Sequence, residues 1–175
     1  KFPPKGGDYQ LIPQWLLDGA LEKPPTENPG RHIGVDIARS GSDSSVAVVT
    51  VDGVLKHTDR WDSEDLMVTA RRILRIAAEW NVPGENIHID MDGLGAGVVD
   101  RIREEGASCD PVDFGGLPMG DWDWLIGSEV KILNRRAELH WIGRMALLNH
   151  HAQIPEDFKP TVWRQLAWTN SEYNE

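Results

Sequence analysis

The sequence contains very little cysteine, no long apolar run and no excess of basic charge. Cys109 is the single cysteine among 175 residues, which excludes a disulfide framework or a multi-cysteine zinc site within the chain and suits a reducing cytoplasm. No apolar stretch is long enough to cross a membrane, and residues 1–10 lack the apolar region of a signal peptide. The formal net charge of −10 repels nucleic acid overall, so contact with DNA requires a local basic patch.

Two segments precede the part of the chain that predicts a compact domain. Residues 11–21 favour a short helix, and the proline-rich segment 22–30 is typical of a linker. The compact domain is therefore expected to begin near Arg31, with residues 1–30 acting as a tether from something upstream. With 40% hydrophobic residues, the remaining chain is long enough to bury a core of its own.

Hydrophobic spacing and turn residues predict a mixed order of strands and helices after Arg31. Asp52-Gly53 is a strong hairpin signal, and Asp62 is expected to cap the helix that follows. The predicted elements are strands at 31–38, 44–51 and 54–61, a helix ending near residue 81, a strand at 87–91, a helix at about 97–105, a strand at 109–115, a loop at 115–127, a long helix from about Ser128 and a helix at about 157–168. Three antiparallel strands followed by a parallel series predict an α/β fold, a mixed sheet flanked by helices.

Asp36 lies inside an apolar run, residues 34–49, that otherwise predicts a buried strand. A carboxylate costs several kcal/mol to bury alone, so it needs a partner, a metal ion or an exit to solvent. Asp90 occupies a similar position in the strand at 87–91, and the two strands are plausible neighbours in a sheet of this order. Alternatively, each aspartate is a solvated residue at a strand end.

If the two strands are neighbours, Asp36 and Asp90 face each other across about 5 Å. Like charges at that distance repel, so either one carboxyl stays protonated or a cation lies between them. Oxygen ligands suit Mg²⁺ or Mn²⁺. Two such ions about 4 Å apart are able to assist displacement at a phosphodiester. The pair therefore predicts a divalent-metal site.

Two further aspartates are secondary candidates for metal ligands. Asp43 is an ordinary turn residue that could also reach the site from its rim. Asp92 alternates with Asp90 and would point to the same side if the strand continued that far. The glycine-rich turn at 93–97 could bind phosphate at a helix N-terminus, although close packing beside the site explains it better.

Three basic residues near the start of the predicted long helix are candidates for contact with DNA. Lys131, Arg135 and Arg136 could supply the local positive field that a nucleic-acid backbone requires. A charged helix face is also commonly just solvated, so these residues alone are a weak indication.

Four segments together resemble the nuclease domain of tailed-phage terminase large subunits. They are GVDIARSGSDSSVAVV (34–49), IHIDMDGLGAGVVDRI (87–102), PVDFGG (111–116) and NRRAELHW (134–141). The resemblance runs from about Arg31 to Trp168. It implies an RNase H-like fold for residues 31–175 and an endonuclease that cuts concatemeric DNA during packaging, with Asp36 and Asp90 as catalytic acids of a cluster holding two Mg²⁺ or Mn²⁺ ions. Asp43 matches an acid often present near that site.

The same resemblance implies partners and a setting. Residues 2–21 look like the segment that joins such a domain to an N-terminal ATPase domain. The implied partners are double-stranded DNA, the portal and the small terminase subunit, with no membrane. The implied location is the host cytoplasm, at the procapsid portal during packaging.

One feature of the family has no counterpart in this sequence. Family members carry a third essential aspartate on a late helix, and this chain contains no such motif. Either a truncated C-terminus or the omission of a disordered tail would explain this. Two acids out of three predict weak metal binding and slow cleavage.

Three other functions fit parts of the pattern. A resolvase or transposase core would use the same acids. An actin-like or Hsp70-like ATPase shares the sheet order, but it needs roughly twice this length and an adenosine-binding segment. A docking module for the portal or for DNA would need no catalytic site.

Overall fold

A computed structural model of the chain describes residues 11–22, 30–38, 43–62, 65–121 and 132–158. The strands are β1 (Arg31–Asp36), β2 (Ser44–Val51), β3 (Val54–Asp62), β4 (Ile87–Asp90) and β5 (Asp110–Val112). The helices are α1 (Gln14–Glu22), α2 (Leu66–Trp80), α3 (Gly95–Glu104) and α5 (Arg135–Leu148), with short 3₁₀ turns η1 (Gly84–Asn86) and η2 (Glu156–Phe158).

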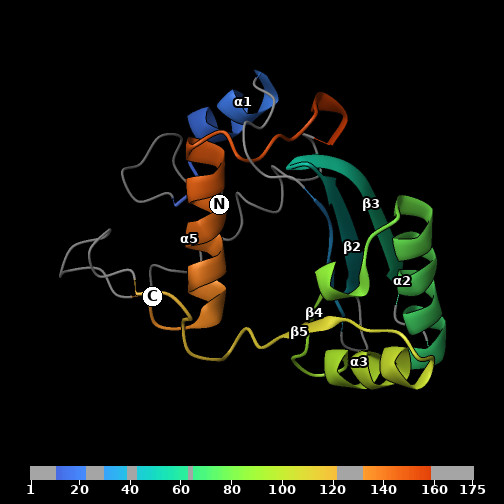
Figure 1. The fold of residues 1–175 in the computed structure, drawn as a ribbon. Helices are drawn as coiled ribbons and strands as arrows, with labels where there is room; N and C mark the ends of the chain where they lie inside the picture. Colours follow the sequence, from blue (N-terminus) through green and yellow to red (C-terminus); the bar gives the residue numbers. More distant parts are fainter. Residues whose placement is uncertain (1–10, 23–29, 39–42, 63–64, 122–131, 159–175) are drawn as a thin grey trace.

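The five strands form one mixed sheet in the order β3-β2-β1-β4-β5. β1, β2 and β3 are antiparallel neighbours, whereas β4 runs parallel to β1 and β5 runs parallel to β4. Figure 1 shows α2 and α3 on one side of this sheet and α1 and α5 on the other. The α/β mixed sheet predicted from the sequence is therefore confirmed, including the neighbouring positions of β1 and β4.

The turn between β2 and β3 contains the residue types that its backbone conformation requires. Asp52 and Gly53 both have positive φ, at 50° and 75°, as a type I′ hairpin turn requires. Further along the hairpin the register shifts between Val49 and Thr50. Thr50 pairs with Leu55 and Val49 pairs with His57, so Lys56 is an extra residue, a β-bulge.

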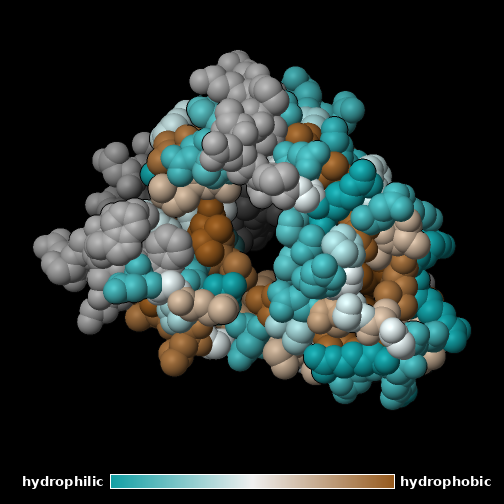
Figure 2. Space-filling model, viewed as in Figure 1, coloured by the Kyte–Doolittle hydropathy of each residue, from teal (hydrophilic) through white to brown (hydrophobic). Residues whose placement is uncertain are grey.

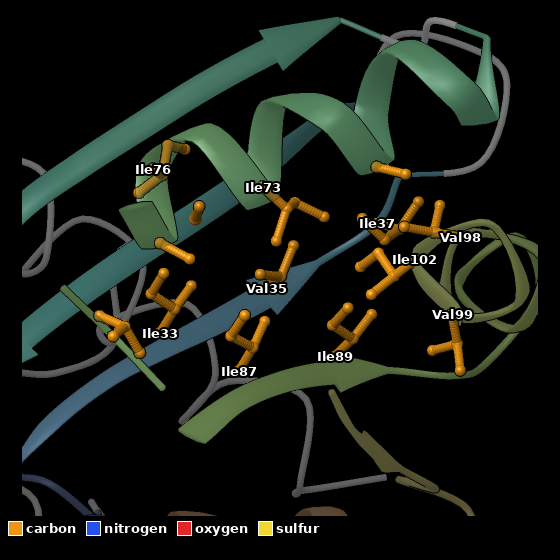
Figure 3. Close-up of a cluster of buried hydrophobic side chains, with 14 of the residues drawn as sticks. Ile33, Val35, Ile37, Ile73, Ile76, Ile87, Ile89, Val98, Val99 and Ile102 are labelled. Atoms are coloured by element: carbon orange, nitrogen blue, oxygen red, sulfur yellow. The ribbon is translucent and has the colours of Figure 1, made fainter. Parts of the chain in front are cut away.

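The main core lies between the sheet and the helices α2 and α3. Figure 3 shows isoleucine and valine side chains from β1 and β4 meeting those of the two helices. Ile33, Ile73, Ile89 and Ile102 are fully buried there. β1 buries Ile33 and Val35, two residues apart, on this side and exposes the residues between and beyond them on the other, because side chains alternate across a strand.

A second apolar cluster lies on the opposite side of the sheet. Leu16 and Leu17 of α1 pack with Leu147 of α5 and Leu55 of β3. Figure 2 shows the molecule hollowed between α5 and the sheet, and an apolar pocket of about 360 Å³ lies between β2, β3 and α5. Within the described part of the chain, no helix combines the length and apolar character needed to span a membrane.

Three predicted helix boundaries were wrong. The cap of α2 is Asp65, whose side chain accepts a hydrogen bond from the Met67 amide at 2.7 Å, and not Asp62. The long helix predicted from about Ser128 is not continuous, because residues 132–134 are not helical and α5 begins at Arg135, where the Asn134 side chain accepts a hydrogen bond from the Ala137 amide. Ser128 itself lies outside the described residues. α3 begins at Gly95, two residues earlier than predicted. Most of the helix predicted at 157–168 lies outside the described residues.

Candidate active site

Asp36 and Asp90 end two adjacent parallel strands at the same level of the sheet. Val35 pairs with Ile89 in the parallel ladder between β1 and β4, and Asp36 and Asp90 are the next residue on each strand. Adjacent strands lie about 4.8 Å apart. Both aspartates lie on the face opposite the main core, because Val35 and Ile89 point into that core. The proximity predicted from the sequence is confirmed.

A polar pocket of about 500 Å³ opens on this face, at the ends of β1 and β4. All four aspartates that the sequence indicated as candidate metal ligands line it, together with two arginines. The lining residues used below are Asp36, Asp43, Asp90, Asp92, Arg60 and Arg136. The pocket therefore combines a concentration of carboxylates with cations at its edge.

Asp90 is the most buried of these carboxylates, with 8% of its surface exposed. Burial raises the pKa of Asp90 above its ordinary value, and the nearby charges of Asp92 and Asp36 raise that pKa further. A hydrogen bond from the Asp92 amide to Asp90 Oδ1, at 3.0 Å, and the guanidinium of Arg136 act in the opposite direction. The net shift means that an ionised Asp90 is poorly compensated by the residues around it.

Asp92 reaches the pocket from the turn after β4, not from a continued strand. β4 ends at Asp90, and the turn folds back so that Asp92 Oδ2 lies 3.9 Å from Arg136 Nη2. The glycine-rich turn then packs closely. A side chain at Gly95 would place its Cβ 1.7 Å from the Asp90 carbonyl oxygen. The close-packing interpretation of residues 93–97 thus holds at Gly95.

The basic residues predicted to contact DNA have different surroundings. Arg136 lines the acidic pocket. Arg135 instead forms an ion pair with the buried Glu138, with 2.6 Å between Arg135 Nη1 and Glu138 Oε2. Lys131 lies outside the described residues.

Sequence reasoning missed Arg60, which reaches the pocket because of the bulge at Lys56. In the shifted register Arg60 pairs with Val46, which in turn pairs with Asp36. The three residues therefore form one row across the sheet, on the face of the pocket. Asp59 turns to the other face, where its carboxylate binds the guanidinium of Arg72 on α2 at 2.8 and 2.9 Å. No sequence pattern marks this bulge. Only the strand pairing along the β2–β3 hairpin shows that Arg60 faces the pocket.

The donor set suits a hard divalent cation only in part. Asp36 and Asp90 supply carboxylate oxygens side by side, and the raised pKa of Asp90 marks a charge that a cation would compensate. Among the residues that the structure describes, no three histidine, cysteine, aspartate or glutamate side chains are grouped closely enough to hold a metal ion. Asp43 and Asp92 line the pocket without joining the pair in such a group.

No protein-family model matches the chain, and no curated protein matches its sequence. Solved structures do match its fold. A mutant nuclease domain of the large terminase subunit gp2 of bacterial virus Sf6, with manganese and beta-thujaplicinol, aligns with a TM-score of 0.65 and 16% identity over 90% of this chain and 80% of that chain.

Two further structures agree. The large terminase nuclease of thermophilic phage G20c with bound magnesium gives a TM-score of 0.64 and 14% identity, over 93% of this chain and 81% of that chain. A mutant of the Sf6 subunit with calcium gives a TM-score of 0.64 and 16% identity, over 90% of this chain and 81% of that chain. At these identities the likeness establishes the fold. The chain has the RNase H-like fold of phage terminase nuclease domains, as the sequence resemblance implied.

Proposed function

We propose that this chain is the nuclease domain of a phage large terminase subunit, and that its acidic pocket hydrolyses phosphodiester bonds of double-stranded DNA with Mg²⁺ or Mn²⁺. The observation that carries the proposal is the pair Asp36 and Asp90, which end adjacent parallel strands in one polar pocket. The fold likeness to nuclease domains solved with manganese, magnesium and calcium supports it.

Asp36 and Asp90 would hold the metal, and the other acids would assist from the rim. Two bound ions would activate a water nucleophile and stabilise the charge that develops on the phosphate. Asp36 is exposed, whereas Asp90 is buried and accepts a hydrogen bond from the Asp92 amide. Asp43 and Asp92 line the same pocket, and they would orient water there or complete the ligand set.

Arg60 and Arg136 would bind backbone phosphates on either side of the acids. Both residues line the pocket, and their charge would provide the local positive field that a chain of net charge −10 needs in order to hold DNA. Because the described residues offer two adjoining carboxylates rather than a group of three, we expect weak metal binding and slow cleavage.

The wider role that we propose follows the same likeness. The domain would cut concatemeric DNA during packaging, in the host cytoplasm at the procapsid portal. Residues 1–30 would connect it to an ATPase domain, and the portal and the small terminase subunit would be its partners.

Replacement of Asp36 by asparagine tests this function. Incubation of a supercoiled plasmid with Mn²⁺ should give nicked and linear products, and EDTA should prevent them. Asp36→Asn should reduce the rate at least roughly a hundredfold, because a lost metal ligand removes several kcal/mol of transition-state stabilisation. Asp100→Asn, at an exposed aspartate of α3 paired with Arg103, is the matched control and should cut like the unchanged chain. Equal, metal-dependent rates for Asp36→Asn and Asp100→Asn would contradict the assignment.

A further inference from the structure

Glu138 of α5 is a buried carboxylate that the proposed chemistry does not use. Only 1% of its surface is exposed, although it is charged and lies in the first turn of a helix. Burying a carboxylate costs several kcal/mol unless hydrogen bonds and an opposite charge compensate it. Its partners therefore indicate what the residue does.

Those partners join the helix to the segment after β5. Glu138 Oε1 accepts from the Gly120 amide at 2.7 Å, and Oε2 accepts from the Met119 amide at 2.9 Å and from Arg135 Nη1 at 2.6 Å. Residues 113–121, here called the β5–α5 segment, are thereby tied to α5 through two backbone N–H groups. Hydrogen bonds to a charged acceptor are about twice as strong as neutral ones.

Further contacts hold the same two parts together. The Arg135 amide donates to the Gly116 carbonyl at 2.8 Å, and the Arg136 amide donates to the Phe114 carbonyl at 3.0 Å. The guanidinium of Arg136 lies 5.5 Å from the centre of the Phe114 ring. Figure 1 shows the segment running from β5 to the end of α5 where that helix begins. The first turn of α5 is thus packed against the β5–α5 segment, which follows the edge strand β5.

This docking decides where the guanidinium of Arg136 lies. The far end of α5 packs through Leu147 against α1 and Leu55, away from the acidic pocket. The near end carries Arg136, which lines the pocket 3.9 Å from Asp92. A shift of the first turn relative to the β5–α5 segment would move Arg136 relative to the acids.

We propose that Glu138 is a positioning residue, which clamps the first turn of α5 to the β5–α5 segment so that Arg136 faces the acidic pocket and binds a DNA phosphate there. The proposal rests on the proposed nuclease function. Glutamine at this position would keep the volume of the side chain. It would lose the ion pair with Arg135, and its NH₂ group would meet an N–H donor of the segment. The clamp would loosen while the rest of the core stayed unchanged.

The test is the salt dependence of DNA binding, measured by fluorescence anisotropy with a labelled duplex and Ca²⁺ in place of Mn²⁺. Loss of one phosphate contact lowers the slope of log K against log salt by about 0.9, and lowers affinity roughly five- to tenfold near about 0.1 M salt. We expect Arg136→Gln and Glu138→Gln to lower the slope by the same amount. The double variant should lower it no further, because both changes remove one contact.

Two more variants separate positioning from general loss of structure. Partial unfolding reduces the fraction of active protein without changing the slope, so a lower slope is specific to a lost contact. Gly120→Pro removes one N–H donor from the exposed segment and leaves Glu138 intact, and it should lower the slope even if Glu138→Gln fails to fold. Arg103→Gln, which removes an exposed arginine of α3, should leave the slope unchanged.

The inference is overturned if Arg136→Gln lowers the salt slope but Gly120→Pro and a folded Glu138→Gln do not. In that case both variants would show the same slope as the unchanged chain. The inference is equally overturned if the double variant falls below Arg136→Gln alone, or if Arg136→Gln has no effect on the slope. A chain that neither binds the duplex nor cuts plasmid overturns the proposed function itself, which is a different result from any of these.

Discussion

Replacing Asp90 by asparagine is expected to stabilise the metal-free protein and to abolish the stabilisation that Mn²⁺ gives to the unchanged chain. Burial and the charges of Asp92 and Asp36 raise the pKa of Asp90, so the folded state holds this proton more tightly than the unfolded chain does. Stability therefore falls as pH rises from the ordinary carboxyl pKa through the higher pKa of folded Asp90. Asparagine can accept the same hydrogen bond from the Asp92 amide without carrying the charge.

Thermal unfolding at about pH 7, with and without Mn²⁺, measures both effects. At a hundredfold excess over its dissociation constant, the ion adds about 2.7 kcal/mol, which for a domain of this size raises Tm by roughly 5 to 10 °C. Asp90→Asn should melt higher than the unchanged chain in EDTA and show no such gain with Mn²⁺. In EDTA the difference should disappear at a pH below the ordinary carboxyl pKa. An Asp90→Asn protein that melts lower in EDTA and gains as much from Mn²⁺ as Asp100→Asn would contradict the account.

Replacing Gly95 by alanine is expected to damage both the fold and the site. The new Cβ would lie 1.7 Å from the carbonyl oxygen of Asp90 and 2.8 Å from its carbonyl carbon. Both are backbone atoms, so α3 must move away from the end of β4. Overpacking of a core costs about 1–3 kcal/mol and sometimes more. Because the contact is with Asp90 itself, the movement also displaces a proposed metal ligand, and a misplacement of about 1 Å can cost roughly a hundredfold in rate.

Gly143→Ala in α5 is the matched control for that change. A Cβ at Gly143 meets nothing within 4 Å, so alanine should stabilise the helix by about 0.5–1 kcal/mol. Urea unfolding and plasmid cleavage with Mn²⁺ compare the two proteins. Gly95→Ala should lose both stability and cleavage, whereas Gly143→Ala should keep both. If Gly95→Ala matched Gly143→Ala in both measurements, the close approach of α3 to Asp90 would have no importance for the site.

The order of strands in the sheet could be predicted because several independent sequence patterns agree. Alternating apolar residues, the Asp52-Gly53 turn and the helical spacing of α2 all indicate the same order of elements. That order makes β1 and β4 neighbours, which brings Asp36 and Asp90 together. The pairing of the two proposed metal ligands could therefore be predicted from the sequence alone.

Helix starts were less predictable, because several residues near each start could serve as the cap. Asp62 and Asp65 are both good N-cap residues, and only the fold shows that β3 continues through Asp62 and leaves Asp65 to cap α2. For α5, Asn134 is the N-cap because the next two residues, Arg135 and Arg136, are held by the β5–α5 segment. Their backbone amides donate to carbonyl groups of that segment. These contacts join residues that no local pattern relates.

The two charged residues that sequence reasoning missed depend on single structural details. Arg60 faces the pocket because one extra residue, Lys56, moves the rest of β3 by one position, and a slip of one residue turns a side chain to the other face of a sheet. Glu138 looks like an ordinary residue of a charged helix face. Its burial, its ion pair with Arg135 and its hydrogen bonds to the Met119 and Gly120 amides distinguish it from a solvated glutamate, and they appear only in the folded chain.

The central claim is that Asp36 and Asp90 together bind a divalent cation, and titration of Mn²⁺ by calorimetry tests it most directly. This measurement does not depend on how fast the chain cuts DNA. The unchanged chain and Asp100→Asn should bind Mn²⁺ with the same affinity, whereas folded Asp36→Asn should lose binding by at least roughly tenfold, the range seen when a metal site loses supporting residues. Equal Mn²⁺ affinity in all three proteins would contradict the claim that Asp36 and Asp90 bind the cation together.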